Sequence, residues 1–248
     1  MQRYLGSKQL NLENLKNLAI ETAKEAGEYL LKNKAEKKEI HAEKGRDIKL
    51  EIDRTTEKII RSSLNKSSIN ILGEEFGGDI TDGPLWVIDP IDGTANYFRG
   101  LDQCCVSIAL MNNDQAMIGV IYNFNTNELF HGQHNGGAFL NEVPISVSNI
   151  SEKNKASLST GFPASESIES SLEFLEGLQG WKKIRMFGSA ALSCAYIASG
   201  RCDAYIEKGV YLWDFAAGVC LVKEAGGRVE YTKVDSDRYA VNFDNNCL

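Results

Sequence analysis

The chain has 248 residues, 43% hydrophobic and 25% charged, a composition typical of a globular protein with one large domain or two small ones. Its formal net charge of −7 argues against nucleic acid or an anionic membrane as a partner. An anionic substrate would therefore need local compensation from a metal ion or from a few basic side chains.

The first predicted element is a long amphipathic helix over residues 12–33. Its leucine and alanine side chains recur at helical spacing, and Asn11 is a suitable N-cap. The lysine- and glutamate-rich stretch 32–49 follows, and its charge predicts a solvated loop.

Acidic residues stand at the next two structural joints. Asp53 precedes a second helical pattern, where it can cap the helix or bind a ligand. A short apolar strand over residues 69–72 then ends in Gly73-Glu74-Glu75. The two glutamates are either a solvated pair or part of a site.

The run Trp86-Val87-Ile88-Asp89-Pro90-Ile91-Asp92-Gly93-Thr94 is the most informative segment. Residues 86–88 predict a buried strand that stops at Asp89, because Pro90 disfavours helix at the residue before it. Asp92-Gly93 then predicts a tight turn. Two carboxylates placed this close repel one another unless a hard, oxygen-preferring cation such as Mg²⁺ lies between them.

Residues 104–147 alternate between apolar and polar side chains, which predicts an antiparallel sheet. Its strands are expected at 106–110, 117–122, 128–131 and 137–140. The polar segment 148–155 then joins two halves of the chain.

The second half alternates strand and helix, which is typical of an α/β arrangement. Gly200 and Gly226 stand where helix C-caps belong. Strands are expected at 156–160, 184–187, 204–207 and 228–231, and helices at 169–178, 190–199 and 215–225.

Trp213-Asp214-Phe215-Ala216-Ala217-Gly218 opens the last of these helices, so Asp214 is the fourth acidic joint. Asp53 and Asp214 can each be explained as an N-cap, and Asp92-Gly93 as an ordinary turn. Taken together, with Thr94 beside them, the acids predict a shared metal cluster.

The six cysteines form no CxxC pair, and no histidine has a partner at zinc-ligand spacing. A disulfide framework and a zinc site are therefore not expected. Residues 1–9 are polar, no apolar run is long enough to span a bilayer, and a cytoplasmic location is predicted.

Three segments of the chain resemble the signature segments of the inositol monophosphatase family: Gly73-Glu74-Glu75, Trp86 to Thr94 and Trp213 to Gly218. The members of this family are Mg²⁺-dependent, lithium-sensitive phosphatases. The resemblance extends from the first helix to about Tyr231. It implies an α/β fold with layered α-β-α-β-α order, an antiparallel sheet in the N-terminal half and a mixed sheet in the C-terminal half. Residues 1–150 would carry most metal ligands, and residues 151–248 would carry Asp214 and the substrate pocket.

The same resemblance implies two or three Mg²⁺ ions per site. Glu74, Asp89 and the backbone carbonyl of Ile91 would hold the first, and Asp89, Asp92 and Asp214 the second. A third, weaker ion would contact Glu74 near the segment that contains Lys44 and Asp53.

Catalytic roles follow from the same comparison. Thr94, with Glu74, would orient and activate the attacking water, and Asp53 belongs to the same catalytic group. Gly93 and Thr94 would offer backbone N–H groups to the phosphate. A phosphorylated Asp89 or Asp92 is an alternative, although a metal-ligand role suits two acids at this spacing better.

The resemblance further implies substrate contacts from Gly188, Ser189, Ala190, Glu207 and Asp214. Ser189 can equally be a helix N-cap, and Glu207 can be part of a strand-end ion pair. Tyr211-Leu212 replaces the Ser-Glu or Thr-Glu pair typical of nucleotide-bisphosphate phosphatases, which favours an inositol, polyol or sugar monophosphate.

Bisphosphate nucleotidase, fructose-1,6-bisphosphatase, histidinol phosphatase and a non-enzymatic regulatory protein stay open as alternatives. The expected partners are a small phosphorylated metabolite and, by family resemblance, a second copy of the chain, with no nucleic acid and no membrane.

Overall fold

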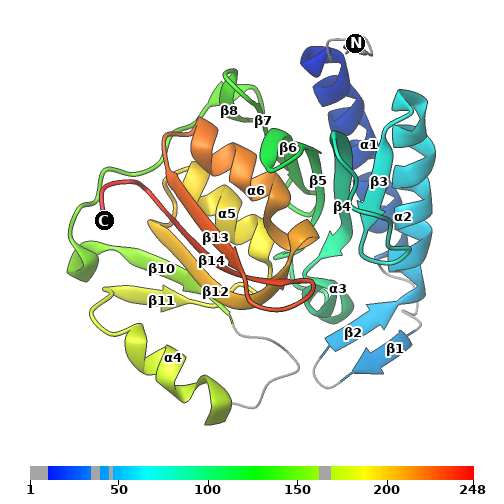
Figure 1. The fold of residues 1–248 in the computed structure, drawn as a ribbon. Coiled ribbons are helices and arrows are strands. Elements are labelled where there is room, and N and C mark those ends of the chain that lie inside the picture. The colour runs from blue at the N-terminus through cyan, green and yellow to red at the C-terminus, as the bar shows by residue number, and fades with distance from the viewer. Residues whose placement is uncertain (1–10, 35–39, 45–46, 162–168) are drawn as a thin grey trace, which may run out of the picture.

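The computed structural model describes residues 11–34, 40–44, 47–161 and 169–248, which form five layers in the order helix, sheet, helix, sheet, helix (Figure 1). This arrangement confirms the predicted layered α/β architecture. None of the helices in these ranges is both long enough and apolar enough to cross a membrane.

The larger sheet has seven strands that lie side by side in chain order. Neighbours are antiparallel except β3 and β4, which run parallel because residues 74–83 return the chain to the start of the sheet. The predicted antiparallel sheet is therefore corrected to a mixed one at this single pair. The strands are β3 (Asn70–Gly73), β4 (Pro84–Asp92), β5 (Cys105–Asn112), β6 (Gln115–Asn123), β7 (Glu128–Gln133), β8 (Gly137–Leu140) and β9 (Val143–Pro144).

Two helices, α1 (Leu12–Asn33) and α2 (Glu51–Leu64), cover the outer face of this sheet. The predicted first helix is confirmed with its bounds, and Asn11 caps it by accepting a hydrogen bond from Asn14 N at 3.1 Å. Apolar side chains of α1 pack on the sheet because they recur every three or four residues; they include Ala19, Ala23, Ala26 and Leu30.

The segment expected to be a solvated loop instead contains a hairpin of β1 (Ile40–Lys44) and β2 (Asp47–Leu50). Apolar residues alternate with polar ones along both strands, and the high charge obscures this period-two pattern. Residues 35–39 and 45–46 of the same prediction lie outside the described residues.

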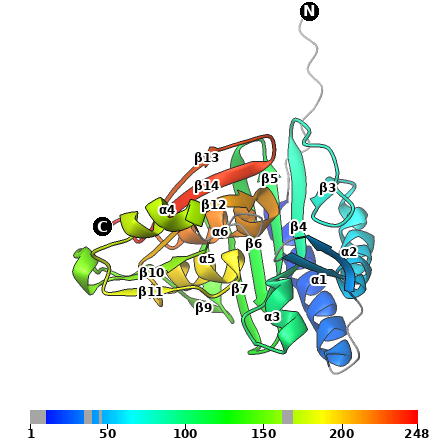
Figure 2. The ribbon, with the colours of Figure 1, turned by 90° about the horizontal axis from the view of Figure 1, so that it is seen from below.

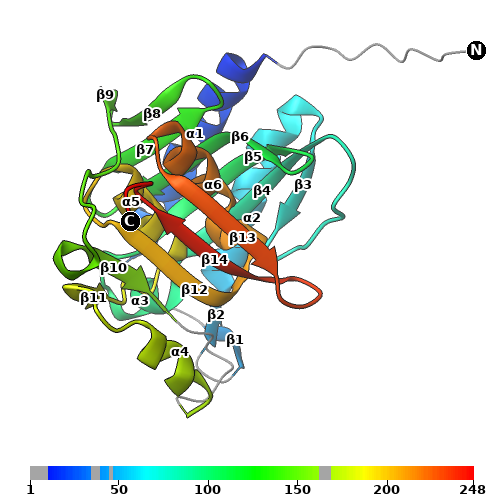
Figure 3. The same ribbon diagram turned by 60° about the vertical axis from the view of Figure 1, so that its left-hand side comes forward.

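The second sheet is mixed, as predicted, with the order β11-β10-β12-β14-β13. Strands β10, β11 and β12 are parallel, while β14 is antiparallel to both β12 and β13, beside which it lies (Figure 3). The sequence did not predict β14. The strands are β10 (Ser157–Thr160), β11 (Lys183–Arg185), β12 (Ala204–Tyr211), β13 (Arg228–Lys233) and β14 (Arg238–Asp244).

Helices α5 (Ala190–Ala198) and α6 (Leu212–Glu224) lie between the two sheets (Figure 2), and both are largely apolar because each is covered on two sides. Gly200 follows the end of α5 and Gly226 follows the end of α6. Both have a left-handed backbone conformation, which confirms the two predicted caps. Helix α4 (Leu172–Gly177) lies on the far side of the second sheet. The remaining short helices are α3 (Thr94–Arg99), η1 (Asn65–Ser67), η2 (Lys153–Lys155) and η3 (Glu169–Ser171).

Candidate active site

The acidic run lies at the end of β4, which continues to Asp92 instead of stopping at Asp89. Asp89 pairs with Ser107 of β5, and Asp92 pairs with Cys105, so one β5 residue opposes Pro90-Ile91. This β-bulge tolerates a proline, which cannot donate to the ladder. Residues three apart in a regular strand face opposite sides, but the extra residue turns both carboxylates to the same face.

Asp92 is held by the N-terminus of α5. Its oxygens accept hydrogen bonds from the Ser189 hydroxyl, from Ala190 N at 3.2 Å and from Ala191 N at 3.0 Å. Ser189 is also the N-cap of α5, because its Oγ accepts from Leu192 N at 3.2 Å. The N-cap alternative for Ser189 is confirmed, and its substrate contact stays a prediction.

Replacement of Ser189 by alanine should lower the free energy of unfolding by about 1–2 kcal/mol, because it removes an N-cap and a hydrogen bond to a buried carboxylate. Chemical denaturation of the two proteins measures the difference. Ser189→Thr keeps the hydroxyl and should stay within about 0.5 kcal/mol of the native chain. Equal losses in both variants would contradict this role for the hydroxyl.

Asp214 lies in the first turn of α6, which begins at Leu212, three residues earlier than predicted. Its Oδ2 accepts a hydrogen bond from Tyr211 N at 2.7 Å. Asp214 is therefore the third residue of the helix and not its N-cap. Its carboxylate still satisfies one of the N–H groups left free at a helix start.

Asp53 lies within the first turn of α2, not ahead of it, and its side chain is only 2% exposed. The interpretation of Asp53 as an N-cap is therefore wrong. Its Oδ1 lies 3.3 Å from the hydroxyl of Thr94, which also donates to the Ile91 carbonyl at 2.9 Å. The fold thus brings Asp53 to the end of β4.

Glu74 lies in the turn after β3, and a residue missed by sequence reasoning holds that turn. Glu57 of α2 is fully buried and accepts hydrogen bonds from Glu75 N at 2.7 Å, Phe76 N at 3.2 Å and Arg61 Nε at 2.7 Å. A sequence signal for this was present, because residues 53, 57 and 61 share one face of a helix.

The turn Gly93-Thr94 needs a glycine. Gly93 has φ of +89°, and a Cβ there would lie 2.7 Å from the Gln103 carbonyl and 3.0 Å from that of Gly188. The Asn96 side chain, also missed by sequence reasoning, donates to the carbonyls of Gln103 and Phe187 at 2.7 Å each. These contacts bring the predicted residue Gly188 against the end of β4.

The acids are close enough to perturb one another. Burial, with the charges of Glu74, Asp92, Asp214 and Asp53, raises the pKa of Asp89 well above its usual range. Burial and the charges of Asp92 and Glu74 do the same to the pKa of Asp214. Burial raises the pKa of Asp92 to about 6, although its hydrogen bonds with α5 oppose the shift.

Glu207 of β12 belongs to the same electrostatic cluster. Its carboxylate accepts a hydrogen bond from Tyr205 Oη at 2.8 Å and lies against Gly161, where an added Cβ would come within 2.5 Å of Glu207 Oε1. Burial raises the pKa of Glu207 to about 7, and Asp92 contributes to the shift. Glu207 is thus placed beside the metal-ligand candidates, and no ion pair to it is found among the described residues.

These pKa shifts predict how the metal-free chain responds to pH. Because the folded-state pKa of Glu207 is raised from 4.5 to about 7, its contribution to stability is present below about pH 4.5 and is lost as pH rises through 7. Compared with a Glu207→Gln variant, the native chain should therefore lose about 2 kcal/mol of unfolding free energy between pH 5 and pH 8. Urea denaturation in a chelating buffer measures this, and parallel pH curves would contradict it.

The donor set suits a hard cation, because carboxylates and a backbone carbonyl are the ligands that Mg²⁺ prefers. As the side chains stand, no three acidic, histidine or cysteine residues in the described ranges enclose one ion. Asp92 and Asp214 are instead engaged by backbone N–H groups. The third ion is expected near the segment that contains Lys44, and the side chain of Lys44 lies outside the described part of the chain.

A sequence profile of the inositol monophosphatase family matches residues 11–242. Over 230 residues the chain is 40% identical to the Nus factor SuhB of Xylella fastidiosa, covering 90% of this chain and 84% of that protein. It is 39% identical over 221 residues to an inositol monophosphatase of Mesembryanthemum crystallinum, covering 84% and 82% of the two chains. Among solved structures, the extragenic suppressor protein SuhB of Bartonella henselae matches with a TM-score of 0.86 and 31% identity, over 94% of this chain and 95% of that one.

Proposed function

The chain belongs to the inositol monophosphatase family, and from this premise we propose that it hydrolyses a small phosphate monoester, such as an inositol, polyol or sugar monophosphate, to the alcohol and inorganic phosphate. The observation that carries the proposal is the convergence of buried and half-buried acids from separate elements on the end of β4. Burial, together with their mutual charges, raises the pKa values of Asp89 and Asp214, so the arrangement is unfavourable without a cation.

This set of acids suits two Mg²⁺ ions and a third that binds more weakly. Glu74, Asp89 and the Ile91 carbonyl would hold the first, and Asp89 would share the second with Asp92 and Asp214. When bound, the metal neutralises phosphate charge and lowers the pKa of a coordinated water.

The chain's own residues would position the reactants. The Thr94 hydroxyl, which lies beside Asp53, would orient the attacking water together with Glu74. The N–H groups of Gly93 and Thr94 would bind phosphate oxygens at the turn that opens α3. Positioning and electrostatics are sufficient for in-line attack, so no phosphorylated aspartate is required.

The substrate alcohol would lie beside α5. Gly188, Ser189 and Ala190 lie next to Asp92 through the contacts described above. Glu207 is near enough for the charge of Asp92 to add to the effect of burial in raising the pKa of Glu207. A carboxylate that accepts hydrogen bonds from hydroxyl groups suits a polyol. The position of Glu207 therefore supports an inositol, polyol or sugar substrate over a nucleotide. Asp214 would contact both the metal and the substrate.

A second candidate comes from the relatives, because one of them at 40% identity is named a Nus factor. A role in transcription, with or without phosphatase activity, is therefore carried as an alternative. The absence of nucleic-acid partners, the homodimer and the cytoplasmic location stay predictions from the sequence.

The test is phosphate release from inositol, sugar, nucleotide and histidinol phosphates, with Mg²⁺ and with a chelator. We expect Mg²⁺-stimulated turnover that is greatest on a polyol or sugar monophosphate and inhibited by lithium in the millimolar range, roughly as expected for a hard monovalent ion at such a site. Greater kcat/KM on a bisphosphate nucleotide would replace the substrate class. No Mg²⁺-stimulated release from any compound would overturn the enzymatic proposal and favour the alternative.

A further inference from the structure

The first turn of α6, which carries Asp214, is flanked by an aromatic and cationic cluster that the proposed mechanism does not use. The rings of Tyr211 and Trp213 stack with centroids 4.8 Å apart and planes 9° from parallel. Arg238, the first residue of β14, places its guanidinium carbon 5.0 Å from the Tyr211 ring centre and donates from Nη2 to Tyr211 Oη at 3.1 Å. We call Tyr211, Trp213 and Arg238 the α6 clamp.

The residue after Asp214 is fixed from the other side. Phe215 is fully buried and packs against Tyr231 of β13 and Tyr239 of β14, with ring centres 5.2 and 5.3 Å away. Arg238 of β14 therefore contacts Tyr211, three residues before Asp214, and the next residue, Tyr239, contacts Phe215, the residue after it. The start of β14 thus determines where the first turn of α6 lies.

The seven-stranded sheet contacts the same turn. Ser107 Oγ lies 3.5 Å from the Trp213 carbonyl, and Ser107 is the β5 residue paired with Asp89. The peptide that precedes Asp214 is therefore located relative to Asp89 as well as to β14.

We propose that Tyr211 and Arg238 are positioning residues that act on Mg²⁺ binding through Asp214, an inference that rests on the proposed function. The α6 clamp holds the Tyr211 peptide, whose N–H donates to Asp214 Oδ2 at 2.7 Å. Among the described residues nothing donates to Asp214 Oδ1, so that oxygen is available for a metal. Residues that orient a metal ligand in this way affect affinity without touching the ion.

The experiment is calorimetric titration of the full-length chain with MgCl₂ in the absence of substrate, so that its readout does not depend on turnover. Tyr211→Leu removes the stacked ring and the acceptor of Arg238, and we expect about tenfold weaker Mg²⁺ binding. Arg238→Met removes the guanidinium but keeps the length of the side chain, and should act in the same direction. Tyr211→Phe keeps the stack and should recover affinity to within about threefold of the native chain.

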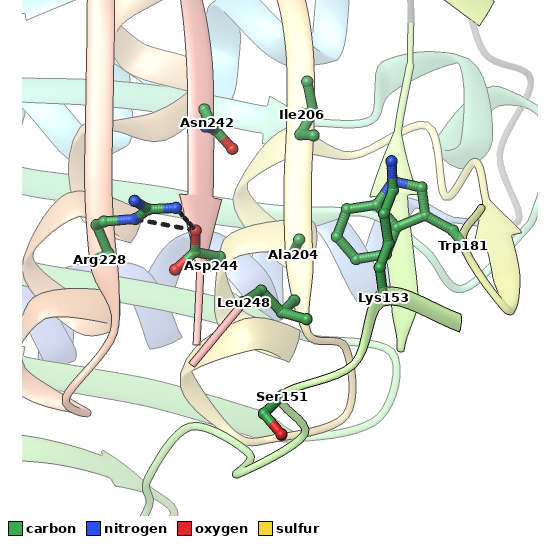
Figure 4. A pocket seen from close by; sticks show the side chains of 9 residues that line it. All are labelled: Ser151, Lys153, Trp181, Ala204, Ile206, Arg228, Asn242, Asp244 and Leu248. Carbon is green, nitrogen blue, oxygen red and sulfur yellow. Dashed lines mark hydrogen bonds and ion pairs between the residues drawn. The ribbon is translucent and has the colours of Figure 1, made fainter. Parts of the chain in front are cut away.

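The matched control is Arg228→Met, in the neighbouring strand β13. Arg228 donates to Asp244 and lines a separate cavity of about 300 Å³ on the outer face of the sheet, with Lys153 and Trp181 (Figure 4). This variant removes a guanidinium from the same sheet, at a position that does not contact the α6 clamp. Its Mg²⁺ affinity should equal that of the native chain.

The outcomes separate the two proposals. Weaker binding in Tyr211→Leu and Arg238→Met, recovery in Tyr211→Phe and no change in Arg228→Met would support the inference. Unchanged affinity in the clamp variants, or an equal loss in the control, would overturn it while the proposed function stands. If Tyr211→Leu does not fold, the pair Tyr211→Phe and Arg238→Met decides in the same way. A native chain that binds no Mg²⁺ would overturn the proposed function, and the inference with it.

Discussion

Asp89→Asn is expected to reduce Mg²⁺-dependent phosphate release by at least about a thousandfold. Asp89 is 2% exposed, and burial together with the charges of Glu74, Asp92, Asp214 and Asp53 raises its pKa. In the proposed site it is the ligand shared by two cations, and an amide provides only one neutral oxygen. Steady-state phosphate release at saturating Mg²⁺ measures the loss.

The same substitution should have the opposite effect on the stability of the metal-free chain. Removal of one buried negative charge from a like-charged cluster should raise the free energy of unfolding by about 1–2 kcal/mol, or the melting temperature by roughly 2–6 °C. Mg²⁺ should stabilise the native chain more than the variant. Thermal denaturation with and without a chelator measures both effects.

Asp244→Asn is the matched control, because Asp244 is equally buried but is paired with Arg228. Loss of this ion pair should destabilise the chain and leave activity nearly unchanged. If Asp89→Asn behaves like Asp244→Asn, destabilised and still active, then Asp89 is a structural carboxylate and the proposed metal site is wrong.

Much of the fold was predictable because local pattern and tertiary packing agree. Helix 12–33 has one apolar stripe and one cap, and its bounds were predicted correctly. The period-two strands between 104 and 147 pair with their neighbours in the chain, so their register depends on short turns. The acids of the site were found because each stands at the end of a predicted element.

The predictions that were wrong or missing concern features that depend on segments far apart in the chain. Strand β14 lies between β12 and β13, and its mixed sequence gives little local signal, although Arg238 and Tyr239 contact the turn that carries Asp214. The bulge at Pro90-Ile91 was missed because a proline alone suggests an end, whereas the pairing of β4 with β5 extends beyond it. Both features determine where acids of the site lie. The sequence identified these acids but did not predict their positions in space.

Glu57→Ala should cost about 3–5 kcal/mol of unfolding free energy, because it removes the partner of Arg61 and leaves two backbone donors without an acceptor. Metal affinity should fall as well. The carboxylate of Glu57 fixes the turn that carries Glu74, and it fits there only because Gly73 has no side chain: an added Cβ would lie 2.3 Å from Glu57 Oε1. Urea denaturation and calorimetric Mg²⁺ titration measure the two losses.

Glu224→Ala is the matched control for this prediction, since Glu224 also holds a turn by accepting backbone hydrogen bonds, from Asn135 N at 2.9 Å, Gly136 N at 3.2 Å and Gly137 N at 2.9 Å. It lies ten residues beyond Asp214 in α6, about 15 Å along the helix. Its loss should lower stability without changing Mg²⁺ affinity. Equal Mg²⁺ affinity in the two variants would mean that Glu57 contributes to the stability of the fold and not to metal binding. Glu74 would then reach its position without the contact to α2.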